Sequence, residues 1–402
     1  MKIALVHDWV VKLGGAENCL ELFHRLYPEA PLYTLFFDKK SVERLGFAPE
    51  QVHASMLQGW RRIQQRYRRY LPILPYAIEQ MDLSSYDLIF TSSHCAAKGV
   101  LTRADQLHIC YCHAPVRYAW DLAHAYLREH HIDKGWKSLI ARVVLHYLRI
   151  WDTQTANRVD YFIANSQYTA RRIWRVYRRE AQVIYPPVDL QTYVPEENKG
   201  DYFLFASRLV PSKKTDMVIK AFNETGLPLI VVGDGSAYNQ CRSLAAPNVE
   251  LLGWRDKEEL AKLVGRARAL VFAADEDFGI VLVEAQACGT PVIALGKGGA
   301  AESVIPANGS NWHEATGVFF HEQSVRALNS AVEQFIDWED KFSPQVIWQN
   351  AQRFGEERFC AEIEEFVETK YQEFQKRGLH PVTSGMNGLN DYNKAKRRYP
   401  PH

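Results

Sequence analysis

The chain has 402 residues, 47% of them hydrophobic and 24% charged, which suits a folded protein of two ordinary domains and excludes a largely disordered chain. Its seven cysteines are scattered and odd in number, so a disulfide framework is excluded and a reducing cytoplasm is expected. The formal net charge is +1, but residues 1–185 carry 25 Lys and Arg against 17 Asp and Glu, so this half is expected to attract anionic partners.

The apolar run at the N-terminus is interrupted by charge at Lys2 and Asp8, before the apolar region of a secretion signal can form. No uninterrupted apolar run approaches the ~18 residues that are needed to cross a bilayer. We therefore expect a cytoplasmic protein that has neither a signal peptide nor a membrane span.

Short apolar runs alternate with helical patterns along the chain, which is the rhythm of βαβ units and parallel sheets. The first series of predicted strands comprises residues 2–9, 32–37, 88–93, 108–113 and 161–166. Two prolines and a charged stretch then predict a linker at residues 186–200. The second series comprises residues 202–207, 229–232, 249–252, 269–273, 292–295 and 317–320, with helices among them at 215–223 and 257–267.

This order predicts an α/β protein with two Rossmann-like, doubly wound domains, at residues 1–185 and 201–340. Helices at residues 341–377 follow and are expected to cross back to the N-terminal domain. Residues 378–402 contain Gly, Asn and Pro without periodicity, which predicts a frayed tail. Two open sheets that face each other form a cleft, and ligands bind there beyond the carboxyl ends of the strands.

Two short motifs follow predicted strands. Residues 14–17, Gly-Gly-Ala-Glu, open a helix, where glycines let a ligand approach the backbone and the helix start favours an anion. An ordinary turn explains these glycines equally well, and their spacing is not the dinucleotide fingerprint. Arg208 and Lys213 follow the first strand of the second domain, where two cations can clamp a diphosphate as it leaves. The alternative is surface charge around a proline turn.

The third motif is the stretch at residues 275–285, which follows a strand and leads into an apolar helix. Glu276 lies in the turn and Glu284 in the first turns of the helix, while the amides from Phe278 to Val281 face any anion held at the helix start. One carboxylate can meet sugar hydroxyls while the other holds a ribose diol. Acidic capping is the alternative, but it does not explain the Phe-Gly pair or the second glutamate.

These motifs resemble those of the family 4 retaining glycosyltransferases, which have the two-domain GT-B fold. Within the family the chain is similar to bacterial mannosyltransferases that build O-antigen or exopolysaccharide. The resemblance covers roughly residues 1–375 and rests on six motifs in the same order, namely residues 14–17, 112–115 (Cys-His-Ala-Pro), 164–166 (Ala-Asn-Ser), 208 with 213 (Arg and Lys), 232–235 (Val-Gly-Asp-Gly) and the Glu-x7-Glu block that encloses Phe-Gly.

The resemblance implies catalytic roles for four positions. Glu276 contacts the hydroxyls of the donor sugar, Arg208 and Lys213 hold the diphosphate, and His113 lies beside the transferred sugar. The positions implied to bind the rest of the donor, from the diphosphate to the base and the ribose, are Gly14, Gly15, Arg255, Asp256, Phe278, Gly279, Ile280, Val281 and Glu284. The chain departs from the family pattern at residues 206–207 and 273–274, where a glycine and a proline are common, but neither position supplies a functional side chain.

Three other kinds of site share parts of these motifs. His113 could join Cys110 and Cys112 in a zinc site, or lie in the core, but Cys-x-Cys-His lacks the usual spacing between paired zinc ligands. Asp275 and Asp277 spell the Asp-x-Asp metal motif of the other main glycosyltransferase fold, yet the two nearby cations already supply positive charge, so no metal is expected. The Asp-Phe-Gly triplet matches a kinase motif, but the catalytic loop of kinases is missing from the sequence.

Two segments combine arginine with aromatic residues. Residues 59–71 hold five arginines and no acid, and residues 171–179 repeat the mixture. Such segments suit the interface of an anionic membrane, although a solvated basic face explains them as well. Nucleic acid is not expected, because no nucleic-acid-binding motif accompanies them. We therefore expect peripheral contact with the inner face of the membrane.

The predicted function is transfer of a hexosyl group, with mannosyl from GDP-mannose as the first candidate, to a lipid-linked saccharide. We expect retention of the anomeric configuration and no cofactor. No enzymic nucleophile is evident, and a same-face displacement needs none, whereas double displacement requires a carboxylate at the anomeric carbon. A nucleotide-sugar epimerase of the same architecture and a non-catalytic module that binds sugar nucleotides are the alternatives.

Overall fold

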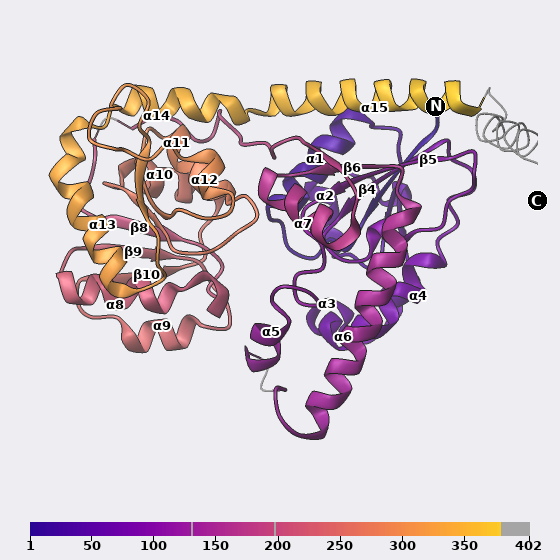
Figure 1. Ribbon diagram of the computed structural model, residues 1–402, viewed down its shortest axis with the longest axis horizontal. Helices are drawn as coiled ribbons and strands as arrows, with labels where there is room; N and C mark the ends of the chain where they lie inside the picture. The colour runs from indigo at the N-terminus through magenta and orange to yellow at the C-terminus, as the bar shows by residue number, and fades with distance from the viewer. Residues whose placement is uncertain (130–131, 197, 379–402) are drawn as a thin grey trace, which may run out of the picture.

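The computed structural model describes residues 1–129, 132–196 and 198–378, and within them the chain forms two parallel sheets in two domains (Figure 1). The first sheet has the strand order β3-β2-β1-β4-β5-β6-β7 and the second has the order β10-β9-β8-β11-β12-β13. The strands are β1 (Ile3–His7), β2 (Leu32–Thr34), β3 (Val52–Ala54), β4 (Leu88–Ser93), β5 (Leu107–Cys112), β6 (Tyr161–Ala164), β7 (Ala181–Val183), β8 (Phe203–Ala206), β9 (Leu229–Val232), β10 (Val249–Gly253), β11 (Leu270–Phe272), β12 (Val292–Leu295) and β13 (Gly317–Phe320).

The predicted fold class is confirmed, because both sheets are parallel and helices cover both of their faces. Every strand predicted from the sequence is present, although five of the eleven are shorter than expected. The strands β4 and β5 are buried at all six positions, which is why they stand out as continuous apolar runs. The sequence analysis missed β3 and β7, which are three-residue edge strands whose side chains are mostly exposed or half-buried.

The N-terminal domain carries seven α-helices in the described residues, and α5 and α6 are among those that were not predicted. They are α1 (Gly15–Leu26), α2 (Lys39–Arg44), α3 (Ile63–Arg66), α4 (Leu74–Glu79), α5 (Ala123–Glu129), α6 (Gly135–Thr155) and α7 (Gln167–Tyr177). The C-terminal half carries α8 (Thr215–Thr225), α9 (Tyr238–Leu244), α10 (Lys257–Arg266), α11 (Ile280–Ala287), α12 (Ala300–Ser303), α13 (Val325–Trp338), α14 (Pro344–Ala351) and α15 (Glu356–Gly378). Short 3₁₀ turns connect several of these elements, among them η6 (Pro211–Lys213).

The last helix crosses back over the N-terminal domain. Figure 1 shows α15 running along one side of the N-terminal domain, while α6 extends from the opposite side of that domain. In α15, Phe359 and Ile363 are fully buried against Phe23 of α1 and Tyr111 of β5. This contact joins the end of the chain to its first domain. Apart from residue 378 itself, the predicted tail at 378–402 lies outside the described residues.

The connection between the domains runs from the end of β7 at residue 183 to the start of β8 at residue 203, and it includes the predicted linker. Its backbone is held by the C-terminal half, since the amide of Val188 donates to the carbonyl of Phe354 at 2.8 Å. Within the described residues, no helix combines the length and the apolar character that crossing a bilayer requires.

Candidate functional site

The two helix starts that the sequence analysis selected lie against each other across the gap between the domains. Gly15 begins α1 and Ile280 begins α11. A Cβ atom placed on Gly15 would lie only 2.6 Å from Cδ1 of Ile280, so a larger residue there would displace the end of the Ile280 side chain. The amides at the starts of both helices are therefore neighbours, and together they form a place that favours an anion.

The start of α11 has no side-chain cap. Gly279 precedes it with a φ of 81°, a left-handed conformation that suits glycine, and no side chain accepts a hydrogen bond there. Phe278 is buried, with its ring packed between those of Tyr185 and Phe354 at centroid distances of 5.7 and 5.6 Å. The acidic residues before this helix do not cap it, so the capping alternative is wrong. Val281 lies in the first turn and is half-buried.

Lys213 and Glu276 form an ion pair between neighbouring strand ends of the C-terminal sheet. Lys213 closes the turn η6 after β8, and Glu276 lies in the loop after β11, the strand beside β8. Their side chains are 16% and 23% exposed, so the pair is mostly buried but still reaches the surface. Burial, and then the charges of Arg208 and Arg117, lower the pKa of Lys213, while the carboxylate of Asp277 opposes that shift.

Arg208 connects this pair electrostatically with the N-terminal domain. Its guanidinium is among the causes that lower the pKa of Lys213 and also that of His94, although burial is the largest cause in both cases. His94 follows β4 in the N-terminal sheet, so the side chain of Arg208 lies near the strand ends of both domains. Arg208 is exposed and can turn toward a ligand in the cleft.

Asp277 is held by two arginines of the N-terminal domain. Arg117 lies 3.3 Å from its Oδ2 and Arg172 pairs with its Oδ1. Both arginines also contact Asp121, at 3.7 and 2.8 Å. Asp277 and Asp121 therefore share two cations in a cluster that joins the domains. At least one carboxylate of the Asp-x-Asp triplet, that of Asp277, is therefore paired with arginine. Within residues 1–129, 132–196 and 198–378, no group of three or more His, Cys, Asp or Glu side chains is arranged to hold a metal.

A second contact between the domains places Glu302 at the start of α7. Its carboxylate accepts from the amides of Gln167 at 2.7 Å and Tyr168 at 2.8 Å, and from the hydroxyl of Tyr185 at 3.1 Å. A carboxylate at a helix start is favoured by the amides that the helix leaves free. The start of α7 is therefore occupied by the protein itself, unlike the starts of α1 and α11.

His113 directly follows β5 and belongs to a hydrogen-bonded chain of side chains. Its Nε2 lies 2.9 Å from Oγ of Ser92, which lies 3.0 Å from Nδ1 of His7. Nε2 of His7 is 3.7 Å from Oε1 of Glu17 in the predicted Gly-Gly-Ala-Glu motif. Burial, and then the rings of His7 and His94, lower the pKa of His113 well below its usual value, so the imidazole is neutral near pH 7.

The geometry separates His113 from the cysteines of the zinc alternative. Cys110 and Cys112 are buried together in the core that packs against α7, whereas the ring of His113 packs against Tyr111, which points to the other face of β5. Alternating residues of a strand point to opposite faces, so these three side chains do not converge. The partly exposed ring at the strand end also differs from an ordinary core histidine.

Glu284 lies on α11 next to Tyr193 and Lys257. Burial raises its pKa to about 7, against the hydrogen bond from Tyr193 and the charge of Lys257. Lys257 pairs with Asp189 at 2.6 Å. Carboxylate, hydroxyl and ammonium groups thus lie together around Glu284, and the contact with a ribose that the resemblance implies for this residue stays a prediction.

Arg255 and Asp256 make local contacts at the start of α10. Asp256 accepts from the amide of Glu259 at 2.9 Å and caps the helix, and Arg255 lies 3.8 Å from the carboxylate of Glu259. The exposed ring of Trp254 precedes them. Capping accounts for Asp256 on its own, so the contact with a nucleotide base that the resemblance implies for these two residues stays a prediction.

The sequence analysis missed several residues of this region. His7 and Asp8 end the first strand, and Asp8 is fully buried, with its carboxylate accepting from four consecutive amides that begin at His94. Ser92 and His94 likewise lie where β4 ends. Polar residues directly after an apolar strand were the signal that could have found all four, because such ends line the cleft.

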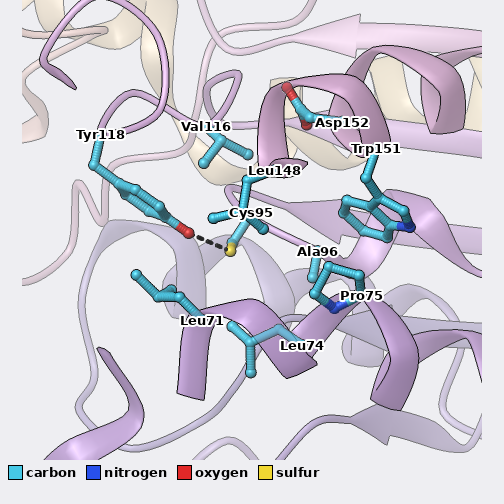
Figure 2. Close-up of a pocket in the computed structure, with 10 residues that line it drawn as sticks. All are labelled: Leu71, Leu74, Pro75, Cys95, Ala96, Val116, Tyr118, Leu148, Trp151 and Asp152. Carbon is cyan, nitrogen blue, oxygen red and sulfur yellow. Dashed lines mark hydrogen bonds between the residues drawn. The ribbon is translucent and has the colours of Figure 1, made fainter. Parts of the chain in front are cut away.

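Figure 2 shows a small space between α4 and α6, lined mainly by apolar side chains. The thiol of Cys95 and the hydroxyl of Tyr118 lie 2.9 Å apart at its edge. Its volume is about 10 Å³, which is room for one water molecule. It is a packing gap in the core of the N-terminal domain and cannot hold a sugar.

Two family models match the chain one after the other. The model described as Glycosyltransferase Family 4 matches residues 32–192, and the model described as Glycosyl transferases group 1 matches residues 192–354. The boundary between them falls in the segment that joins the two sheets. Together they cover both strand-end regions of the cleft.

Curated relatives match shorter stretches. The uncharacterized glycosyltransferase MJ1178 of Methanocaldococcus jannaschii is 33% identical over 153 residues, which are 36% of this chain and 43% of the relative. The GDP-mannose-dependent monoacylated alpha-(1-6)-phosphatidylinositol monomannoside mannosyltransferase of Corynebacterium glutamicum is 32% identical over 183 residues, which are 38% of this chain and 48% of the relative. The chain thus spans about half the length of the curated relatives it matches.

Solved structures resemble the chain over most of its length. Anabaena Alr3699/HepE, solved in complex with UDP-glucose, superposes with a TM-score of 0.66 at 20% identity, covering 92% of this chain and 100% of that one. Sucrose-phosphate synthase from Thermosynechococcus elongatus superposes with a TM-score of 0.68 at 17% identity, covering 93% and 100%. At this level of identity the likeness concerns the fold, which is the two-domain GT-B arrangement.

Proposed function

We propose that the chain is a glycosyltransferase of the family 4 type, which transfers a hexosyl group from a nucleotide sugar to a lipid-linked saccharide with retention of configuration. The observation that carries this proposal is the ion pair of Lys213 and Glu276 in the cleft that the facing starts of α1 and α11 line. A cation, a carboxylate and two sets of free amides suit a sugar diphosphate, which offers hydroxyls at one end and negative charge at the other.

The diphosphate is proposed to lie between the two helix starts. Gly15 keeps the backbone of α1 close to the Ile280 side chain of α11, and Gly14 before it is extended. Arg208 and Lys213 supply positive charge from the strand end beside them. Because these cations and amides are in place before the reaction, they stabilise the charge that develops as the nucleoside diphosphate leaves.

Glu276 is proposed to change partners when the donor binds. It pairs with Lys213 in the structure, but a diphosphate that takes Lys213 leaves the carboxylate free to accept hydrogen bonds from sugar hydroxyls. The lowered pKa of Lys213 reflects how poorly its surroundings solvate a second positive charge, and a diphosphate relieves that cost. Donor binding thus prepares the carboxylate at the sugar.

The transfer is proposed to be a displacement on one face of the sugar. The bond from the anomeric carbon to the phosphate oxygen breaks, the bond to the acceptor oxygen forms on the same side, and the acceptor proton passes to the leaving phosphate. His113 is neutral, so it can hydrogen-bond to the sugar without adding charge. Its partner Ser92 fixes the ring on the other side. This route needs no enzymic nucleophile, no cofactor and no metal ion.

Mannose from GDP-mannose is the proposed donor, because a relative is a mannosyltransferase that depends on GDP-mannose. Action at the cytoplasmic face of a membrane follows from a lipid-linked acceptor. The test is calorimetric titration of the full chain with GDP, UDP, ADP and dTDP, followed by turnover of the matching sugar nucleotide with a lipid extract. Tightest binding of GDP and an α-linked product, seen by NMR, are expected.

The same experiment separates the alternatives. Incubation with donor alone should leave the donor intact over the time of the transfer assay, whereas an epimerase would release nucleotide and an altered sugar without any acceptor. A module that only binds would be saturated by donor and turn over none. Either result would overturn the transferase proposal, and tighter binding of another nucleotide would overturn the choice of GDP.

A further inference from the structure

We propose that α6 is the surface by which this chain lies on an anionic phospholipid bilayer, with lipid phosphate entering the groove between α5 and α6. This inference rests on the proposed function, because it says how an acceptor held in a bilayer reaches the cleft. It moves the site of contact away from the two arginine-rich segments that the sequence analysis selected.

A stripe of exposed apolar side chains runs along α6. Of fifteen large hydrophobic side chains that are exposed in the described residues, six lie within this one helix, so they are not the scattered exposure of an ordinary surface. At 3.6 residues a turn they fall within an arc of about 100°, opposite the side that enters the core. They form the α6 stripe, which comprises Trp136, Leu139, Ile140, Val143, Tyr147 and Ile150.

The positive charge beside the stripe favours an anionic bilayer over a second copy of the chain as its partner. From residue 135 to residue 151 the helix carries Lys137, Arg142 and Arg149 and no acidic residue. A second copy of the chain would bring the same cations against them, and the contact would be opposed by repulsion. A bilayer with anionic headgroups fits both the apolar stripe and the cations, because the stripe can insert at the acyl boundary while the cations pair with the lipid phosphates.

The groove beside the stripe is built for a phosphate. It has a volume of about 350 Å³, and α6 contributes Arg142, Leu145 and Arg149 to one wall. One Nη of Arg149 donates to the carbonyl of Ala119 at 2.9 Å, and Nε of Arg142 donates to Ser138 at 3.1 Å. These bonds orient the two guanidinium groups while leaving further N–H donors of each for a ligand.

The opposite wall of the groove leads toward the cleft. It includes Ala119, Trp120 and His124, which follow Arg117 closely in the chain. Arg117 reaches Asp277, the residue next to Glu276. A lipid whose phosphate lies in the groove would therefore hold its saccharide near the reacting sugar. Figure 1 shows α5 and α6 side by side on the side of the N-terminal domain away from α15.

The two arginine-rich segments offer less for a bilayer in the described residues. Of their large hydrophobic side chains, Trp174 is exposed, and the ring of Trp60 packs edge-on against Tyr70. Arg172 is engaged with Asp277 and Asp121 in the cluster between the domains. Cations without an apolar stripe would add attraction but little insertion.

The test is cosedimentation of the full chain with vesicles of phosphatidylglycerol and phosphatidylcholine, compared with vesicles of phosphatidylcholine alone. We expect binding to the anionic vesicles that weakens with salt. The triple variant Trp136→Ser, Leu139→Ser and Val143→Ser should lose at least about tenfold in affinity. The variant Arg142→Gln with Arg149→Gln should lose roughly 30-fold. The matched control, Trp174→Ser, removes an exposed tryptophan outside α6 and should bind as before.

Nucleotide titration of each variant shows whether it is folded, because the stripe lies outside the nucleotide site. Equal vesicle binding by a folded stripe variant and the unchanged chain would overturn the inference. So would a dimer in solution that the stripe variant converts to monomers, with no vesicle binding by either. Vesicle binding without any sugar transfer would instead leave α6 as a membrane surface and count against the proposed function alone.

Discussion

Glu284 allows a prediction in which stability and ligand binding change in opposite directions. It is a half-buried residue of α11, and burial raises the pKa of its carboxyl group from 4.5 to about 7. A carboxyl group whose pKa is higher in the folded than in the unfolded protein stabilises the fold below pH 4.5, and this stability is lost as the pH rises through about 7. The substitution Glu284→Gln removes the ionisation but keeps an oxygen that can accept from Tyr193.

The magnitude follows from the pKa shift. Each pKa unit corresponds to about 1.4 kcal/mol, so the ionised carboxylate costs the unchanged protein up to about 3 kcal/mol at pH 8. The Glu284→Gln variant has no carboxyl group to ionise, so its free energy of unfolding is not lowered in this way. For a domain of this size, that difference corresponds to a melting temperature on the order of 5–10 °C higher at pH 8. Near pH 4.5, where both side chains are neutral, the two proteins should melt together.

The assay is thermal unfolding of the ligand-free protein at intervals from pH 4 to pH 8, followed by titration with GDP at pH 8. The variant should be more stable and should bind GDP more weakly, because the charged carboxylate is the stronger acceptor for a ribose diol. Glu258→Gln, which changes an exposed carboxylate on α10, is the control and should alter neither property. A Glu284→Gln protein that melts at or below the unchanged protein at pH 8 would refute this reasoning.

Four shorter predictions concern the rest of the cleft. Glu276→Gln should lower kcat about 100-fold with little change in GDP affinity, and near-normal turnover would remove Glu276 from the reacting sugar. Lys213→Ala should weaken GDP binding about tenfold or more by calorimetry, while unchanged affinity would remove it from the phosphate site. Ser92→Ala breaks the link between His7 and His113 and should lower kcat and alter its pH profile, whereas a purely structural serine would leave that profile unchanged. Activity should survive EDTA, and loss that Mg²⁺ restores would show that a metal is required.

The sequence predicted the sheets well because their strands are buried on both faces. In β4 and β5 every position is buried, so the apolar run itself marks the strand. In β3, His53 and Ala54 are exposed, and no such run exists. The helix α6 was missed for a related reason, since its exposed stripe adds apolar residues on the side where an amphipathic pattern needs polar ones.

Within the site, the residues that could be predicted are those whose role is local. Glu276 and Lys213 each follow a strand, and the strand order of a doubly wound sheet brings such ends together. The partners of Asp277 could not be predicted in this way. Arg117 and Arg172 lie 160 and 105 residues away in the chain, in another domain, and nothing in their neighbourhood identifies a carboxylate as their target.

The positive charge of the N-terminal half lies in two separate places in the structure, at the contact between the domains and along α6. Part of this positive charge is paired with the acidic C-terminal half, because Arg117 and Arg172 form ion pairs with Asp277. These side chains are mostly buried, so this attraction is screened little by salt and helps to hold the two helix starts together around a diphosphate. The cations beside the α6 stripe are exposed or half-buried, and α6 itself lies on the side of the N-terminal domain away from α15 (Figure 1). The basic N-terminal half is thus proposed to attract two anions, the leaving nucleotide in the cleft and the phosphates of the bilayer. The α5–α6 groove lies between these two places.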